Sequence, residues 1–344
     1  MRIKKTVSLL AAAGVLSGAA MTADATVLAS SVIQMSDFRL LTPDGEGYRI
    51  LDASDFSKLA GDSTADISAN LHSDGGPGDA EVDSGSALIG SGITIDLTAV
   101  CQGDCSGYTE NTFAALTAPP TEHYATADQR EQGSPISGVG LSVPATIESG
   151  SYVGLTGSDT GSSTSNNGLN TTFSFSTDGV DTIAFDFDVA AYLEAWVDPI
   201  LDLGNASASF NVTFTIEDLG VTDTGDDAAG IVFNWAPDGF TGAFLGGIAT
   251  TEDFDLQTGL SRDQSAAGQS LITPGSPGVK KTGSFFAVST AGLFDDTHDY
   301  KGTFSIKTVA DAQMVAVPEP GSLLILGTGL VTMLGFRARK ARKS

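Results

Sequence analysis

Residues 180–189 read VDTIAFDFDV, and residues 210–217 read FNVTFTIE. In both runs apolar residues alternate with polar ones, so one set of side chains faces a core and the other faces water. Asp198, Pro199 and Gly204 lie between the runs and are typical of turns. The pattern predicts two β-strands, and the turn residues between them favour an antiparallel pair.

The rest of the body has the same character. Further strand candidates are residues 32–41, 87–99, 231–235, 284–289 and 303–309. Helical periodicity is limited to residues 53–59 and 190–196, each long enough for one or two turns. Many short strands with glycine-rich connections predict an all-β fold, an antiparallel β-sandwich or a jelly-roll-like body. We expect one large domain, because the sequence contains no clear linker or internal repeat.

The N-terminus predicts a secretory signal peptide. Three basic side chains lie within the first five residues, residues 7–16 are apolar, and Ala23 and Ala25 form a small-x-small cleavage pattern. We expect signal peptidase to remove residues 1–25. A transmembrane anchor would need a longer apolar run than this one.

The C-terminus combines three elements in a fixed order. Pro318 and Pro320, on either side of Glu319, resist helix formation; residues 323–336 are apolar, and residues 337–343 are rich in Arg and Lys. At about 1.5 Å per residue the apolar stretch spans roughly 21 Å as a helix, which is short for a hydrocarbon core of about 30 Å. The basic cluster favours a cytosolic end and an exported body.

These residues closely resemble the PEP-CTERM sorting signal. The resemblance implies recognition by exosortase, a membrane protease of Gram-negative bacteria, with transient insertion of the C-terminal helix in the inner membrane. It also implies export and release to the cell surface or extracellular matrix, often alongside exopolysaccharide. The predicted organisation is residues 1–25 as signal peptide, 26–316 as an acidic β-rich ectodomain and 317–344 as the sorting signal.

The charge of the body excludes one large class of partners. The chain has a net charge of -25, and residues 26–317 alone contain 9 basic and 40 acidic side chains. Such a body repels phosphate backbones, because nucleic-acid affinity depends on Lys and Arg. We expect no nucleic-acid partner.

Cys101 and Cys105 are the only cysteines. In an exported protein two cysteines favour a disulfide, here closing a short loop that adds modest stability. The alternative, half of a metal site, needs further ligands nearby in space.

One acidic, glycine-rich loop is the best candidate for a calcium site. It contains Asp74, Asp79, Glu81 and Asp83, and Ca²⁺ prefers carboxylate and carbonyl oxygens. The loop does not follow the EF-hand spacing, and a solvated acidic loop explains it more simply. We therefore expect no cofactor, and calcium is the one candidate. Residues 223–227 form a similar acidic loop.

No catalytic motif is evident. Asp186 and Asp188 share one strand face at a spacing that glycoside hydrolysis can use, but a polar strand face explains them equally well. Residues 156–177 hold 12 Ser or Thr and predict an exposed loop that could accept glycans.

Four aromatic residues could form a sugar-stacking platform, although strand aromatics are more often core residues. They are Tyr152, Tyr192, Trp196 and Trp235.

The sequence as a whole predicts an exported, non-enzymatic surface or matrix protein associated with exopolysaccharide or biofilm. The first alternative is an exported polysaccharide hydrolase, which needs two carboxylates converging in a cleft. The second is a calcium-stabilised adhesin or carbohydrate-binding module, which predicts a melting temperature that rises with calcium.

Overall fold

The computed structural model confirms the all-β prediction: two antiparallel sheets pack face to face. The described residues are 25–73, 81–88, 93–106, 108–115, 123–139, 143–157, 161–198, 204–221, 224, 226–263, 268–271 and 279–314. Within them the only helical element is the single 3-10 turn η1 (Ala53–Asp55). Asp52 caps this turn by accepting a hydrogen bond from the backbone nitrogen of Ser54.

The larger sheet has eleven strands. Its main order is β13-β14-β17-β10-β1-β8-β7-β5, with β16 beside β10, β2 beside β1 and β6 beside β7. The bounds are β1 (Ala25–Asp44), β2 (Gly47–Ile50), β5 (Ile93–Asp96), β6 (Val100–Gly103), β7 (Tyr124–Gly133), β8 (Ala145–Gly157), β10 (Ala184–Val197), β13 (Gly242–Phe244), β14 (Gly247–Glu252), β16 (Gly268–Leu271) and β17 (Lys281–Ser289).

The smaller sheet has seven strands. Its order is β12-β11-β18-β9-β3-β4, with β15 beside β11. The bounds are β3 (Phe56–Ser73), β4 (Glu81–Leu88), β9 (Gly161–Thr177), β11 (Gly204–Val221), β12 (Gly230–Trp235), β15 (Gln257–Asp263) and β18 (His298–Met314).

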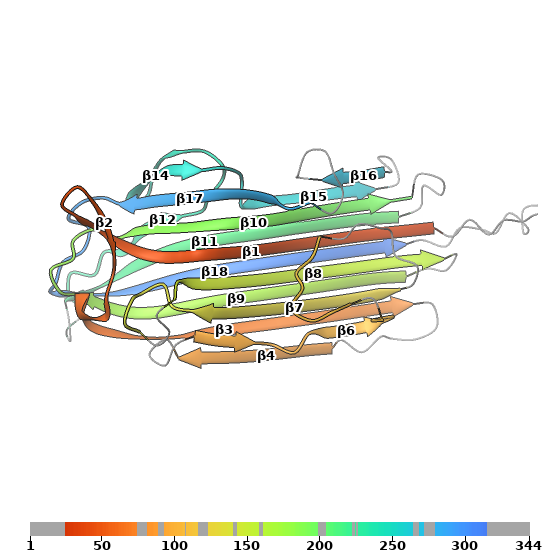
Figure 1. The fold of residues 1–344 in the computed structure, drawn as a ribbon, viewed down its shortest axis with the longest axis horizontal. Coiled ribbons are helices and arrows are strands. Elements are labelled where there is room, and N and C mark those ends of the chain that lie inside the picture. Colours follow the sequence, from red (N-terminus) through yellow and green to blue (C-terminus); the bar gives the residue numbers. More distant parts are fainter. Residues whose placement is uncertain are drawn as a thin grey trace, which may run out of the picture.

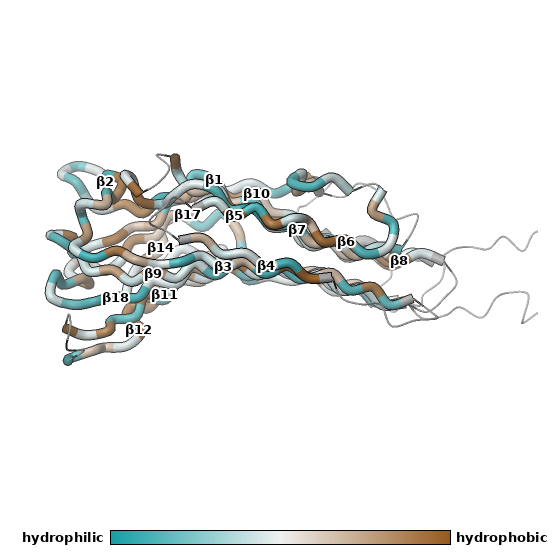
Figure 2. Tube along the Cα trace, turned by 90° about the horizontal axis from the view of Figure 1, so that it is seen from below, coloured by the Kyte–Doolittle hydropathy of each residue, from teal (hydrophilic) through white to brown (hydrophobic). Residues whose placement is uncertain are grey.

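The long strands give the molecule an extended shape. They run parallel to its longest axis (Figure 1), and the view turned by 90° shows the sheets as two layers (Figure 2). β1 alone has 20 residues, about 65 Å at roughly 3.3 Å per residue. Typical strands have 3–10 residues, so these are unusually long.

The core between the layers changes character along this axis. Toward one end it is aromatic, with Phe38, Phe187 and Phe214 in mutual ring contact. Toward the other end small residues such as Ala208 and Ala310 replace them, and both are fully buried. Hydroxyl and amide side chains join the sheets in this small-residue part of the core.

The two runs that predict strands lie in opposite sheets, so the predicted antiparallel pair is wrong. Residues 180–189 contribute to β10 in the larger sheet, and residues 210–217 lie in β11 of the smaller one. Their apolar faces meet across the core, with the ring centroids of Phe185 and Phe214 5.3 Å apart. Alternation shows which face of a strand is buried, but it does not show what the strand pairs with. Two strands whose apolar faces meet across the core of a sandwich give the same pattern as two neighbours in one sheet.

Two local predictions are also corrected. Most of the Ser/Thr-rich segment is not a loop but β9, between β3 and β18 in the smaller sheet. Ser165 and Asn167 are buried there because their polar atoms find hydrogen-bond partners in the facing sheet. Residues 190–196, suggested as a helical turn, belong to β10, and the other suggested turn shrinks to η1 followed by β3.

The remaining strand predictions are largely confirmed. Residues 32–41, 231–235, 284–289 and 303–309 fall within β1, β12, β17 and β18. The predicted run 87–99 splits between the end of β4 and β5.

Candidate functional site

Both ends of the described body lie at the same end of the sandwich, named here the terminal end. β1 begins there at Ala25, and β18 ends there at Met314, which pairs with Gly204. A Cβ added to Gly204 would lie 2.6 Å from Cγ2 of Val27, so the start of β1 and the end of β18 are close. The opposite, distal end includes the start of β18 and the aromatic part of the core.

The predicted sorting residues follow β18 directly. Pro318, Glu319 and Pro320 lie outside the described residues, as do residues 1–24 of the predicted signal peptide. Within the described part of the chain, no helix is long and apolar enough to cross a membrane. Since β18 runs to Met314, any segment that continues the chain starts from the terminal end.

Only the end of the predicted calcium loop, from Glu81 onward, lies within the described residues. Asp74 and Asp79 lie outside the described residues, and Glu81 begins β4. Oδ1 of Asp83 accepts a hydrogen bond of 2.8 Å from the backbone nitrogen of the next residue, Ser84. No group of three or more His, Cys, Asp or Glu among the described residues is placed to hold a metal ion.

Cys101 and Cys105 form a disulfide, with their Cα atoms 6.2 Å apart. Cys101 lies on β6 at one edge of the larger sheet, beside Thr126 of β7. The disulfide closes a short loop at the end of β6, where the chain leaves this edge.

Asp186 and Asp188 do share one face of β10, as predicted. Arg39 Nη2 lies 3.5 Å from Asp186 Oδ2, and the hydroxyl of Ser284 donates a 2.6 Å hydrogen bond to Asp188 Oδ1. Burial raises the pKa of Asp186, while the guanidinium of Arg39 acts in the opposite direction. Both carboxylates already have partners on the sheet surface, as expected for a polar strand face.

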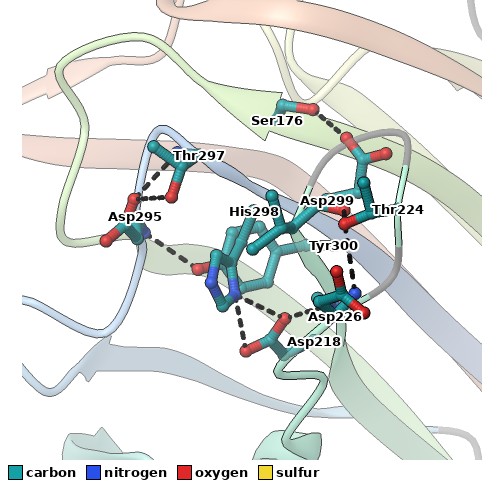
Figure 3. Close-up of polar contacts among 11 residues, drawn as sticks. Ser176, Asp218, Thr224, Asp226, Asp295, Thr297, His298, Asp299 and Tyr300 are labelled. Atoms are coloured by element: carbon teal, nitrogen blue, oxygen red, sulfur yellow. Dashed lines mark hydrogen bonds and ion pairs between the residues drawn. The ribbon is translucent and has the colours of Figure 1, made fainter.

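A cluster of polar side chains joins three strands at the distal end (Figure 3). Nδ1 of His298, the first residue of β18, lies 2.9 Å and 3.1 Å from the two carboxylate oxygens of Asp218 on β11. Gly220 also donates its backbone N–H to Asp218, at 2.7 Å. Among the described residues, no hydroxyl or thiol hydrogen-bonds to the His298 ring.

The turn before β18 is fixed by its own aspartates. Asp295 accepts hydrogen bonds from the backbone and hydroxyl of Thr297, and its backbone nitrogen donates to the Tyr300 hydroxyl at 2.8 Å. Asp299 accepts from Ser176 of β9 and from Lys58 of β3. Figure 3 shows Asp299 directed at Ser176, and Asp295 in contact with Thr297 of the same turn. The contacts hold β3, β9, β11 and β18 together, which is a structural task.

The second acidic loop contributes little to this cluster. Its described residues make local turn contacts, such as the 3.3 Å hydrogen bond from the backbone nitrogen of Asp226 to the Thr224 hydroxyl.

A second hydrophobic cluster lies on the outer face of the larger sheet. Val32, Tyr152 and Tyr192 project from β1, β8 and β10, and Phe113 packs on them from residues 108–115, named here the strap. Figure 1 shows the strap crossing this face. The strap buries Phe113 to 1% exposure.

The strap also buries a carboxylate. Tyr108 donates its hydroxyl proton to Oδ2 of Asp128 at 2.6 Å, and the backbone nitrogen of Asn111 donates to the same oxygen at 2.6 Å. Oδ1 of Asp128 has no hydrogen-bond partner among the described residues. Burial raises the pKa of Asp128, and burial together with the Asp128 contact raises the pKa of Tyr108.

The predicted aromatic platform is therefore only partly assembled. Tyr152 and Tyr192 come together, and Trp196 lies four residues further along β10 on the same face, but Trp235 is in the core between the sheets. The strap covers the two tyrosines, so in this structure they form a packed cluster and not an open binding surface.

Several polar groups have no counterpart in the sequence analysis. Glu131 is buried between the sheets, Glu252 accepts a 2.5 Å hydrogen bond from the Trp235 ring nitrogen, and Gln34 lies between Lys280 and Glu148. Each contact joins different strands, so no local motif identifies it.

Comparison with known proteins supplies the clearest functional signal. Residues 316–340 match the PEP-CTERM protein-sorting motif. No curated protein matches the chain.

Two matching solved structures come from infectious bursal disease virus. The Gt strain structure is 14% identical, with 89% of this chain and 88% of that chain covered and a TM-score of 0.09. The Gx strain structure is 14% identical, with 88% and 87% covered and a TM-score of 0.09. TM-scores this low do not indicate a shared fold.

Proposed function

We propose that this chain, an exported protein with a PEP-CTERM motif for exosortase sorting, is a non-enzymatic component of the cell surface or extracellular matrix. The observation that supports the proposal best is that β18 ends at Met314, at the terminal end, and the matched sorting motif begins two residues later in the sequence. While the tail is inserted in the inner membrane, the terminal end faces the membrane and the distal end points away from it. After processing by signal peptidase and exosortase, the body is released.

The outer face of the smaller sheet suits contact with exopolysaccharide. One row across the sheet consists of Thr172, Thr303 and Thr215, and the next row consists of Asn170, Ser305 and Thr213. These uncharged hydroxyl and amide groups donate and accept hydrogen bonds, as the hydroxyls of a polysaccharide do. The acidity of the body favours a neutral polysaccharide over an anionic one.

A groove of about 490 Å³ interrupts this face. Gly168 lines the groove and lies between Asp66 of β3 and Lys307 of β18 in the strand register. A Cβ added to Gly168 would meet nothing within 4 Å, so the space above it is open. The groove offers a place for one or two sugar rings.

The sorting part of the proposal is tested by the masses of the protein in fractions of its host. We expect wild-type chains outside the cell to lack both predicted signals, and chains with Pro318→Ala and Glu319→Ala to stay in the membrane fraction with the tail intact. Release of the double variant at the wild-type rate would contradict exosortase sorting.

The polysaccharide part is tested by co-sedimentation of the protein with exopolysaccharide purified from the host. Gly168→Phe fills the groove, and we expect it to reduce the bound fraction at least several-fold. Gly47→Phe on β2 is the matched control, because that glycine also has open space around it but lies at the distal end. Equal binding by the two variants would remove the groove from the proposal.

A further inference from the structure

Three polar side chains from distant parts of the chain meet on the outer face of the larger sheet. Gln34 on β1 lies directly opposite Glu148 on β8 in the strand register. The amide nitrogen of Gln34 donates a hydrogen bond to Oε1 of Glu148, and Nζ of Lys280 donates to Oε1 of Gln34. The amine nitrogen therefore contacts the carbonyl group of a carboxamide, while a carboxylate contacts the nitrogen of that same carboxamide.

The carboxylate of Glu148 is held in place from its other side. Arg130 on β7 donates to Oε2 of Glu148 from Nε, at 2.9 Å, and from Nη2. Glu148 is only 7% exposed. Its Oε2 is thus engaged by Arg130, and Oε1 is directed at the Gln34 amide.

The amine of Lys280 is partly withdrawn from water. Burial lowers the pKa of Lys280, which increases the share of the neutral, nucleophilic form, whereas the charge of Glu148 acts in the opposite direction. Oε1 of Glu148 contacts Nε2 of Gln34, so it lies beside the Cδ atom to which the Lys280 nitrogen would bond.

We propose that Lys280 and Gln34 form an intramolecular isopeptide bond, with Glu148 as the catalytic carboxylate. The lone pair of Lys280 Nζ attacks Cδ of Gln34, and Glu148 accepts a proton from the attacking nitrogen. Glu148 then returns this proton to Nε2 of Gln34 as the Cδ–Nε2 bond breaks. The products are a secondary amide and one molecule of ammonia, so the reaction needs no oxidant or other reactant.

The arrangement meets the main requirement of such a step, which is proximity. Holding an amine against an amide carbonyl replaces a bimolecular encounter by an intramolecular one, which lowers the entropic part of the barrier. The bond would link β1 to the segment entering β17, with β10 between them, and join residues 246 positions apart. A covalent closure of that length restricts the unfolded chain strongly.

The test is the mass of the folded, full chain and of its proteolytic peptides. We expect the wild-type protein to be lighter than its sequence mass by one ammonia, and one branched peptide to contain both Gln34 and Lys280. We also expect amine-reactive reagents to leave Lys280 unlabelled after denaturation. A wild-type protein with its full sequence mass and a labelled Lys280 would overturn the proposal. Lys280, Gln34 and Glu148 would then be joined by hydrogen bonds alone.

Three variants separate the roles. Lys280→Arg retains the charge but cannot form the bond, so we expect the full sequence mass and a lower melting temperature. Lys281→Arg is the matched control, because Nζ of Lys281 lies over the Phe254 ring instead, and it should keep the mass deficit. Glu148→Gln should remove the deficit while the circular dichroism spectrum remains that of a β protein; a deficit that persists would exclude Glu148 as the catalytic group.

Discussion

At the scale of single residues, Glu131 is the least expected side chain in the core. It projects from β7 between the sheets, where the Ser63 hydroxyl donates to its Oε2 at 2.5 Å and lies 2.8 Å from the Thr171 hydroxyl. It also borders an apolar cavity lined by Phe38 and Phe304. Burial raises its pKa from 4.5 to about 7.

This shift predicts that Glu131 makes the folded state less stable as the pH rises. Below about pH 4.5 the carboxyl is protonated in both the folded and unfolded chains and costs nothing. Between there and about pH 7 the unfolded chain releases the proton more readily, so the free energy of unfolding falls by up to about 3 kcal/mol. Glu131→Gln should therefore raise the melting temperature relative to wild type at pH 8, by more than it does at pH 4.

The control for this prediction is Glu217→Gln, which changes an exposed glutamate on β11. Melting curves from pH 4 to pH 9 should give a difference from wild type that grows with pH for Glu131→Gln alone. A difference that does not change with pH would show that ionisation of Glu131 is not coupled to folding.

At the scale of elements, the sequence predicts strands better than it predicts their partners. Period-two alternation identifies β10 and β11, because one face of each must be buried. It does not distinguish a neighbouring strand from a strand in the facing sheet, so the predicted pairing of β10 with β11 is wrong. The sequence does not predict β9 as a strand, because Ser165 and Asn167 resemble surface residues until their hydrogen-bond partners in the other sheet are known.

The same reasoning explains what the sequence says about candidate sites. The sorting motif and the cysteine pair are local patterns, and each is readable within a few residues. Gln34, Glu148 and Lys280 are separated by more than 100 residues from one another. Only the register of the sheet brings them together.

The disulfide between Cys101 and Cys105 allows a prediction about stability. Replacing Cys101 and Cys105 by Ser should lower the free energy of unfolding by about 2 kcal/mol, because the loop that the disulfide closes is short. We expect wild-type protein treated with a reductant to melt at the temperature of the double variant. A reductant that also lowered the melting temperature of the double variant would point to an effect unrelated to this disulfide.

At the scale of the whole molecule, charge opposes folding. With 40 acidic and 9 basic side chains between residues 26 and 317, the compact body repels itself, and dissolved salt screens that repulsion. We expect the melting temperature at neutral pH to rise by several degrees between low and moderate sodium chloride. The variant Asp226→Asn with Asp227→Asn, which removes two adjacent exposed charges, should show a smaller rise; an equal or larger rise would contradict the prediction.

The position of β18 also has a mechanical consequence. Its last residue, Met314, leads toward the tail, and β18 is paired along its length with β9 on one side and β11 on the other. A pulling force applied at the tail while the distal end is held acts along the strand axis. The backbone hydrogen bonds on both sides then share the force in shear and must yield together, whereas a force across the strands would open them one pair at a time. Before the tail is cleaved, the body would therefore resist unfolding most strongly against a pull along the strand axis.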